Sequence, residues 1–110
     1  MFDENKRFSK EEKIMKREKF ELGQTVMTRG IKTLCEENAK FFSKMIDCLK
    51  RHQAGDWGDL SEDDCLMNDR ALSKDYPDRI LSAYHIGETK IWIITEWDRS
   101  STTVLLPEEY

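Results

Sequence analysis

The chain has 110 residues, of which 36% are charged and 38% hydrophobic, and it carries a formal net charge of −4. Such a length accommodates one domain with a single core, and no apolar run approaches the roughly 18 residues of a membrane span. No apolar signal core follows the basic N-terminus, so we expect a cytoplasmic protein that is not associated with a membrane.

The distribution of charge and the cysteines indicate what kind of protein this is. Residues 1–19 carry seven basic and five acidic side chains, whereas residues 54–78 carry eight acidic side chains against two basic ones. The leading arm is therefore mildly basic and the body acidic. Cys35, Cys48 and Cys65 are odd in number and far apart, which favours reduced thiols over disulfides or a zinc site. We expect neither a metal nor another cofactor.

The first elements in chain order are an arm and a strand. Ser9 and Glu12 form a capping-box pattern, which predicts a short helix in residues 1–19, although few apolar residues support it. We treat residues 1–19 as a marginal arm and residues 20–110 as a single domain. Phe20, Leu22 and Val26 alternate with polar residues, which predicts a strand of about seven residues.

Two helices are predicted next. The first is long, because apolar residues recur at three- and four-residue spacing from Ile31 to Leu49. Three basic side chains at its end complement the helix dipole, namely Lys50, Arg51 and His52. A turn-rich link over residues 55–59 holds Trp57. The second helix is predicted from Ser61 to about Ser73, with acidic residues in its first turn.

The last third is predicted to be strands. Residues 79–86, 89–97 and 102–106 form strands, with Gly87-Glu88 suited to a type II′ turn and residues 98–100 to a second turn. The fold class is therefore α+β in the order β-α-α-β-β-β. We expect a four-stranded, mainly antiparallel sheet packed by two helices, with a weak N-terminal helix in front.

The predicted sheet is apolar on both faces. Ile91, Ile93 and Trp97 point to one side, while Trp92 and Ile94 point to the other. Two helices cover only one face of a four-stranded sheet. The second face should therefore be covered in part by the N-terminal arm, by a second copy of the chain in a homodimer, or by a partner protein.

The acidic run is the first candidate site. It contributes the candidate binding residues Asp56, Trp57, Asp59, Asp63 and Asp64. The run lacks the ligand spacing and the mid-loop glycine of a calcium loop. A helix N-terminus favours acidic side chains there, so we interpret the run as a solvated surface rather than a metal site.

The turn after the central strand is the second candidate site. Glu96, Asp98 and Arg99 lie there, and with His85 on the neighbouring strand they would suit acid–base chemistry. No nucleophile motif or phosphate-binding loop accompanies them. An ordinary turn with a surface ion pair is the favoured interpretation, and we expect no enzyme.

The tryptophans are the third candidate site. Trp57, Trp92 and Trp97 would suit base stacking on a nucleic-acid-binding sheet, with the basic arm on the phosphates. Because the body is acidic, core or protein-interface positions are the favoured interpretation for these rings.

The second half of the chain carries a family resemblance. Its motifs are Gly-Asp-Trp-Gly-Asp at 55–59, Asn-Asp-x-Ala-Leu at 68–72, Arg-Ile-Leu-Ser-Ala-Tyr at 79–84, Ile-Trp-Ile-Ile-Thr-Glu-x-Asp-Arg-Ser at 91–100 and Thr-Thr-Val-Leu-Leu-Pro-Glu-Glu-Tyr at 102–110. This string resembles a family of small, mostly uncharacterised bacterial proteins of plasmids, prophages and integrative elements. Trp97 departs from the small residue expected at that position, and residues 1–19 fall outside the resemblance.

The resemblance implies a biological setting rather than an active site. Genes of mobile elements help those elements to persist or to evade host defence. We therefore expect a non-enzymatic accessory protein that contacts a host protein, such as an anti-CRISPR or anti-restriction inhibitor of a nuclease complex. The alternative is a nucleic-acid-binding or regulatory factor that uses the basic arm and the sheet tryptophans.

Overall fold

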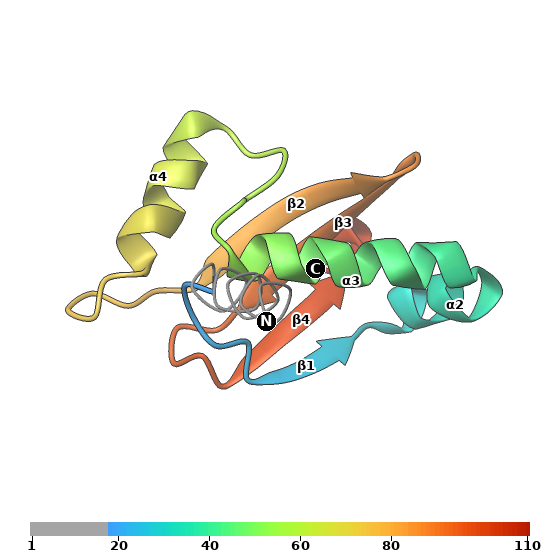
Figure 1. Ribbon diagram of the computed structural model, residues 1–110, viewed down its shortest axis with the longest axis horizontal. Coiled ribbons are helices and arrows are strands. Elements are labelled where there is room, and N and C mark those ends of the chain that lie inside the picture. The colour runs from blue at the N-terminus through green and yellow to red at the C-terminus, as the bar shows by residue number, and fades with distance from the viewer. Residues whose placement is uncertain (1–17) are drawn as a thin grey trace, which may run out of the picture.

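The computed structural model describes residues 18–110, so the helix predicted from Ser9 lies outside the described residues. The fold belongs to the predicted α+β class (Figure 1). Its helices and strands are β1 (Gln24–Met27), α2 (Arg29–Glu37), α3 (Ala39–Gln53), α4 (Glu62–Ala71), β2 (Ile80–Ile86), β3 (Thr89–Thr95), β4 (Ser101–Leu105) and the 3₁₀ turn η1 (Pro107–Glu109). None of the helices in this described part is long and apolar enough to cross a membrane.

The four strands form one mixed sheet in the order β1-β4-β3-β2. β2, β3 and β4 make the predicted antiparallel meander, and β1 joins its far side parallel to β4. Gly87 begins the two-residue turn between β2 and β3 with φ +60°, while Glu88 has no positive φ. This combination is that of the predicted type II′ turn.

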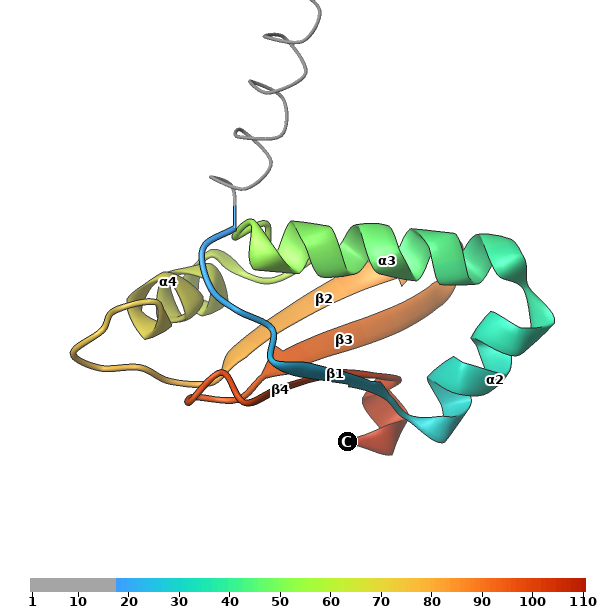
Figure 2. The ribbon, with the colours of Figure 1, turned by 60° about the horizontal axis from the view of Figure 1, so that its bottom comes forward.

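The prediction of one long helix was wrong. The helix breaks at Asn38, which is extended at φ −148° and ψ 107°. Its Oδ1 accepts hydrogen bonds from the amides of Lys40 (2.9 Å) and Phe41 (3.3 Å), so it caps α3. Asparagine favours this N-cap role over a helix interior. The break lets α2 turn back to β1 while α3 lies across the sheet (Figure 2).

The first strand is also shorter than predicted, because it starts only after Gly23. Gly23 has φ +65°, and a Cβ there would lie 2.4 Å from the carbonyl oxygens of Arg99 and Ser100. Glycine is therefore required at this turn. Phe20 and Leu22 lie before the turn and pack against the two cores instead of alternating along β1.

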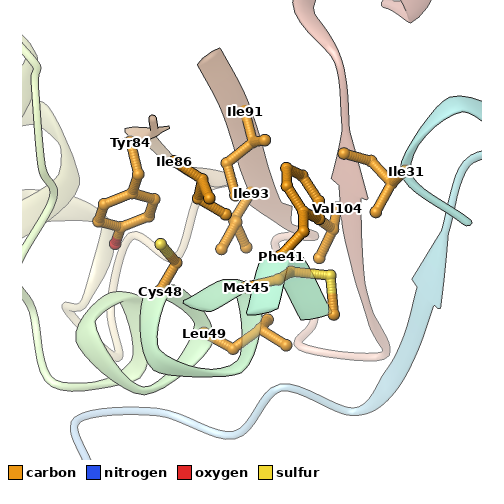
Figure 3. Packing of buried hydrophobic residues seen from close by; sticks show 10 residues of the cluster. All are labelled: Ile31, Phe41, Met45, Cys48, Leu49, Tyr84, Ile86, Ile91, Ile93 and Val104. Atoms are coloured by element: carbon orange, nitrogen blue, oxygen red, sulfur yellow. The ribbon is translucent and has the colours of Figure 1, made fainter. Parts of the chain in front are cut away.

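The main core lies between α3 and one face of the sheet. Figure 3 shows Phe41, Met45 and Leu49 of α3 facing Ile93 of β3 and Val104 of β4. All five side chains are buried, and Ile93 and Val104 have no exposed surface. Burial of such side chains contributes about 1.5–3 kcal/mol each, which makes this layer the chief source of stability.

α4 lies at one end of the sheet instead of across its face, beside β2 (Figure 1). It helps to form a second, smaller core around Trp57, Ala71 and Ile80. The Trp57 ring is stacked on Phe20 and meets the edge of His52. The link before α4 and the segment before β1 therefore meet over the end of the sheet.

A buried chain of hydrogen bonds joins α3 to the sheet. The Thr102 hydroxyl donates to the Leu22 carbonyl (2.6 Å) and accepts from the Thr95 hydroxyl (2.7 Å). Thr95 must then accept from the Nε2–H of His52 (2.9 Å), whose Nδ1 accepts from the Ser82 hydroxyl (2.5 Å). Burial lowers the pKa of the His52 imidazole to about 3, so the ring is neutral and its Nδ1 is free to accept this hydrogen bond.

The second face of the sheet is apolar, with Ala83, Ile94 and Leu105 buried. Part of its cover comes from the C-terminal segment of the chain, which is not among the three covers that the sequence suggested. The Tyr110 ring packs edge-on against Trp92 with the ring centres 5.6 Å apart. The segment around η1 is therefore folded under the sheet (Figure 2).

Glu109 fixes this C-terminal turn to the start of α2. Its carboxylate accepts hydrogen bonds from the Thr28 hydroxyl (2.5 Å) and the amides of Gly30 (2.9 Å) and Leu106 (2.9 Å). Thr28, the N-cap residue of α2, makes no side-chain cap of its own. The helix N-terminus thus receives its negatively charged partner from a residue about 80 positions later in the chain.

Candidate protein-contact site

Three segments meet at one end of the molecule: α4, the loop over residues 72–79, and the turn over residues 96–100 (Figures 1 and 2). We call them the acidic end. Arg99 holds them together, because its guanidinium donates to the carbonyls of Ala71 (2.6 Å), Asp78 (2.6 Å) and Glu96 (3.1 Å). It does so from a left-handed backbone conformation, with φ 59°.

The acidic end exposes large apolar side chains. Leu66 and Met67 on α4 are 55% and 58% exposed, Tyr76 in the loop is 81% exposed, and Trp97 in the turn is 60% exposed. These four are half of the large exposed apolar side chains in residues 18–110. A concentration of this kind marks surfaces that bind other molecules.

The same end is strongly acidic. Residues 62–78 hold six carboxylates against two basic side chains, Arg70 and Lys74. None of the six forms an ion pair with a side chain of residues 18–110. Asp69 accepts a hydrogen bond from the Trp57 indole (3.0 Å), so it also anchors the small core. The negative charge of this end is thus largely uncompensated and faces solvent.

The predicted acidic run is divided by the fold. Asp63 and Asp64 lie exposed in the first turn of α4, as expected. Asp56 is bound by both Nε (2.7 Å) and Nη2 (3.2 Å) of Arg51, and this bond holds the pKa of its carboxyl below the ordinary value. Asp59 contacts the Nδ1 of His85 at 2.5 Å. Across residues 18–110, no three His, Cys, Asp or Glu side chains are grouped to hold a metal.

The three tryptophans do not share a surface. Trp57 is 4% exposed and belongs to the small core, so its ring is not available for contact. Trp92 is half-buried on the second face of the sheet beneath Tyr110. Only Trp97 projects from the protein. The stacking platform that the sequence suggested is therefore not formed.

The four residues of the acid–base hypothesis are also separated. His85 pairs with Lys90, whereas Glu96 follows Thr95 at the opposite end of β3, on the order of 20 Å away at the rise of an extended strand. Glu96 pairs with Arg79 (3.3 Å) instead of Arg99. Asp98 is exposed, and its hydrogen bonds with Ser100 lower the pKa of its carboxyl. His85 and the turn therefore lie too far apart to act on one substrate group.

Tyr76, Leu66 and Met67 were not anticipated as site residues. Leu66 and Met67 are adjacent on α4, so they give no amphipathic spacing, while the buried residues of this helix are Asn68 and Ala71. The sequence did carry one signal: the large apolar residues of this helix are adjacent and form no stripe along one helix face, so a core role did not explain them.

Comparison with models of known protein families, with curated proteins and with solved structures finds no match. The resemblance of residues 55–110 to mobile-element proteins therefore stays a prediction.

Proposed function

We propose that this chain acts without catalysis, by contact between its acidic end and another protein. The observation that carries the proposal is the coincidence of exposed Leu66, Met67, Tyr76 and Trp97 with six unpaired carboxylates at one end of the fold. Aromatic side chains are the usual anchors of protein interfaces, and uncompensated charge guides the encounter.

The charge of this end defines the chemistry of the partner. A surface with an excess of carboxylates associates fastest with a basic surface, and the attraction weakens as salt is added. Nucleic-acid-binding proteins present basic surfaces of this kind to the phosphate backbone. Together with the resemblance to mobile-element proteins, this supports an inhibitor of a host defence nuclease complex of the CRISPR or restriction type. The chain would occupy the basic surface that the nuclease uses for its substrate.

Affinity capture from a nuclease-treated host lysate tests the proposal. The wild-type chain should retain one basic, nucleic-acid-binding protein, and Trp97→Ala should release it. Phe42→Ala is the matched control, because Phe42 is a comparably exposed aromatic residue (45%) on α3. Loss of the captured protein in both variants or in neither would contradict the proposed surface.

Nuclease treatment separates this function from the alternative. Capture that disappears on nuclease treatment, together with salt-dependent binding of the chain to nucleic acid, would favour a nucleic-acid-binding factor. Lys10, Lys13, Lys16 and Arg17 lie outside the described residues, and their neutralisation should then abolish binding. Under the proposed function it should leave capture unchanged.

A further inference from the structure

The two edge strands of the sheet, β2 and β1, differ in how far their outward backbone groups are hydrogen-bonded. At the β2 edge, the Asn68 side chain donates to the Leu81 carbonyl (2.7 Å) and accepts from the Leu81 amide (3.2 Å). Two residues on, the Ala83 amide donates to the Trp57 carbonyl (3.2 Å), and the Asp59 amide donates to the Ala83 carbonyl (2.7 Å). These contacts satisfy the outward backbone groups of Leu81 and Ala83, which closes this edge over residues 81–83.

Within the described part of the chain, the β1 edge has no such cover. The amides of Gln24 and Thr28 donate to β4 or to the residue before it, at 3.0 Å each. Alternate residues of a strand face the same neighbour, so Thr25 and Met27 direct their N–H and C=O groups away from the sheet. These groups make no hydrogen bond to any residue in the range 18–110 outside the sheet. All four residues of β1 are exposed, and no other helix or strand of residues 18–110 lies beyond them (Figure 1).

β1 is short, with four residues, but its sequence does not oppose pairing with another strand. Natural edge strands are commonly protected by lysine, proline or a bulge. Residues 24–27 are Gln-Thr-Val-Met, without charge or proline, and they pair with β4 in continuous register. Val26 and Met27 remain 40% and 39% exposed. An added strand would satisfy the outward backbone groups and cover both side chains.

We propose that β1 pairs antiparallel with β1 of a second copy of this chain, which joins two four-stranded sheets into one. A two-fold axis at Val26 sets Thr25 of each copy opposite Met27 of the other, and this register gives four backbone hydrogen bonds. It also brings the segment before one strand beside the segment after the other. These flanks carry the exposed, oppositely charged Glu21 and Arg29, so the edge is electrostatically complementary to itself.

Sedimentation equilibrium of the full chain tests the pairing. The wild type should show a reversible monomer–dimer equilibrium. Thr25→Pro removes an outward N–H while sparing the bonds to β4, and it should weaken dimerisation roughly tenfold or more. Leu81→Arg is the control, because it places a charge on the second sheet face next to the closed edge. It should leave the edge dimer intact and block a dimer formed through the second face.

Charge reversal gives an independent test that does not depend on strand geometry. Glu21→Arg alone and Arg29→Glu alone should each weaken the homodimer, since like charges then meet across the axis. An equimolar mixture of the two variants should form a heterodimer, because every contact in it is attractive again. A wild type that stays monomeric at all concentrations would overturn the proposal. So would a dimer that resists Thr25→Pro, or a mixture that fails to associate.

Discussion

The buried His52 makes the stability of the fold depend on pH. Its side chain is fully buried, and both ring nitrogens are engaged by hydroxyl groups of the sheet. Burial, with a smaller contribution from the nearby charge of Arg99, lowers the pKa of its imidazole from 6.5 to about 3. The folded protein therefore holds a neutral imidazole at pH values where the unfolded chain binds a proton.

The pH dependence of unfolding follows from this difference. The contribution of His52 is fully present above pH 6.5 and is lost as the pH falls from 6.5 towards 3. Between these two pH values, each unit by which the pH falls should lower the free energy of unfolding by about 1.4 kcal/mol through His52. Urea denaturation between pH 7 and 4 gives the change of the unfolding free energy with pH. In His52→Gln this change should be smaller than in the wild type by about 1.4 kcal/mol per pH unit. Identical slopes in His52→Gln and wild type would contradict the account.

Arg99 carries a second prediction at the residue scale. A left-handed conformation costs a residue with a side chain about 1 kcal/mol, and the three guanidinium hydrogen bonds to backbone carbonyls offset that cost. Arg99→Ala loses the bonds and keeps the strain, so it should destabilise the fold by about 2 kcal/mol or more. Arg99→Gly loses only the bonds. Chemical denaturation should rank Arg99→Gly about 1 kcal/mol above Arg99→Ala, and equal stabilities would show that the backbone conformation is not strained.

At the scale of the elements, η1 and α2 act as one unit through Glu109. Its hydrogen bonds with Thr28 and with the amides of Leu106 and Gly30 lower the pKa of the Glu109 carboxyl. Glu109→Gln removes the charge from the N-terminus of α2, and it should lower the Tm measurably at pH 7. Glu108→Gln provides the matched control, because Glu108 is the neighbouring exposed glutamate but makes no such contact. The difference between the two variants should shrink as the pH falls below the ordinary pKa of a glutamate and towards the lowered pKa of the Glu109 carboxyl, because the stabilisation by its charge is lost over that range.

The elements also show what the sequence was able to predict. Local signals located the meander and its Gly87 turn, because alternation and turn chemistry depend on neighbouring residues. The break at Asn38 was missed, since apolar spacing continues through it. His52 was assigned to the dipole end of α3 with Lys50 and Arg51, but contacts from distant strands bury it as a neutral group. The cap of α2 by Glu109 was likewise beyond local pattern, because it joins residues at opposite ends of the domain.

At the scale of the whole molecule, the large core and the main group of exposed apolar side chains lie in different parts of the fold. α3 and the sheet hold the large core, whereas α4 and its neighbouring loop and turn contribute a small core and a large exposed surface. The sequence predicted acidity in this region and singled out Trp97. It could not place Tyr76, Leu66 and Met67 at the same end, because Arg99 brings the three segments together through backbone carbonyls. The acidic end is therefore a property of the tertiary fold.

The most direct measurement of the central claim is inhibition of the captured partner. Its binding to a labelled nucleic acid is titrated with the wild-type chain, Trp97→Ala and Phe42→Ala. Wild type and Phe42→Ala should displace the nucleic acid at the same concentrations, and added salt should weaken both. Displacement of the nucleic acid by Trp97→Ala should require a concentration at least about tenfold higher, as expected for the loss of an interface anchor. Displacement by Trp97→Ala that equals the wild type, or a partner that binds the chain and its nucleic acid together, would contradict contact through the acidic end.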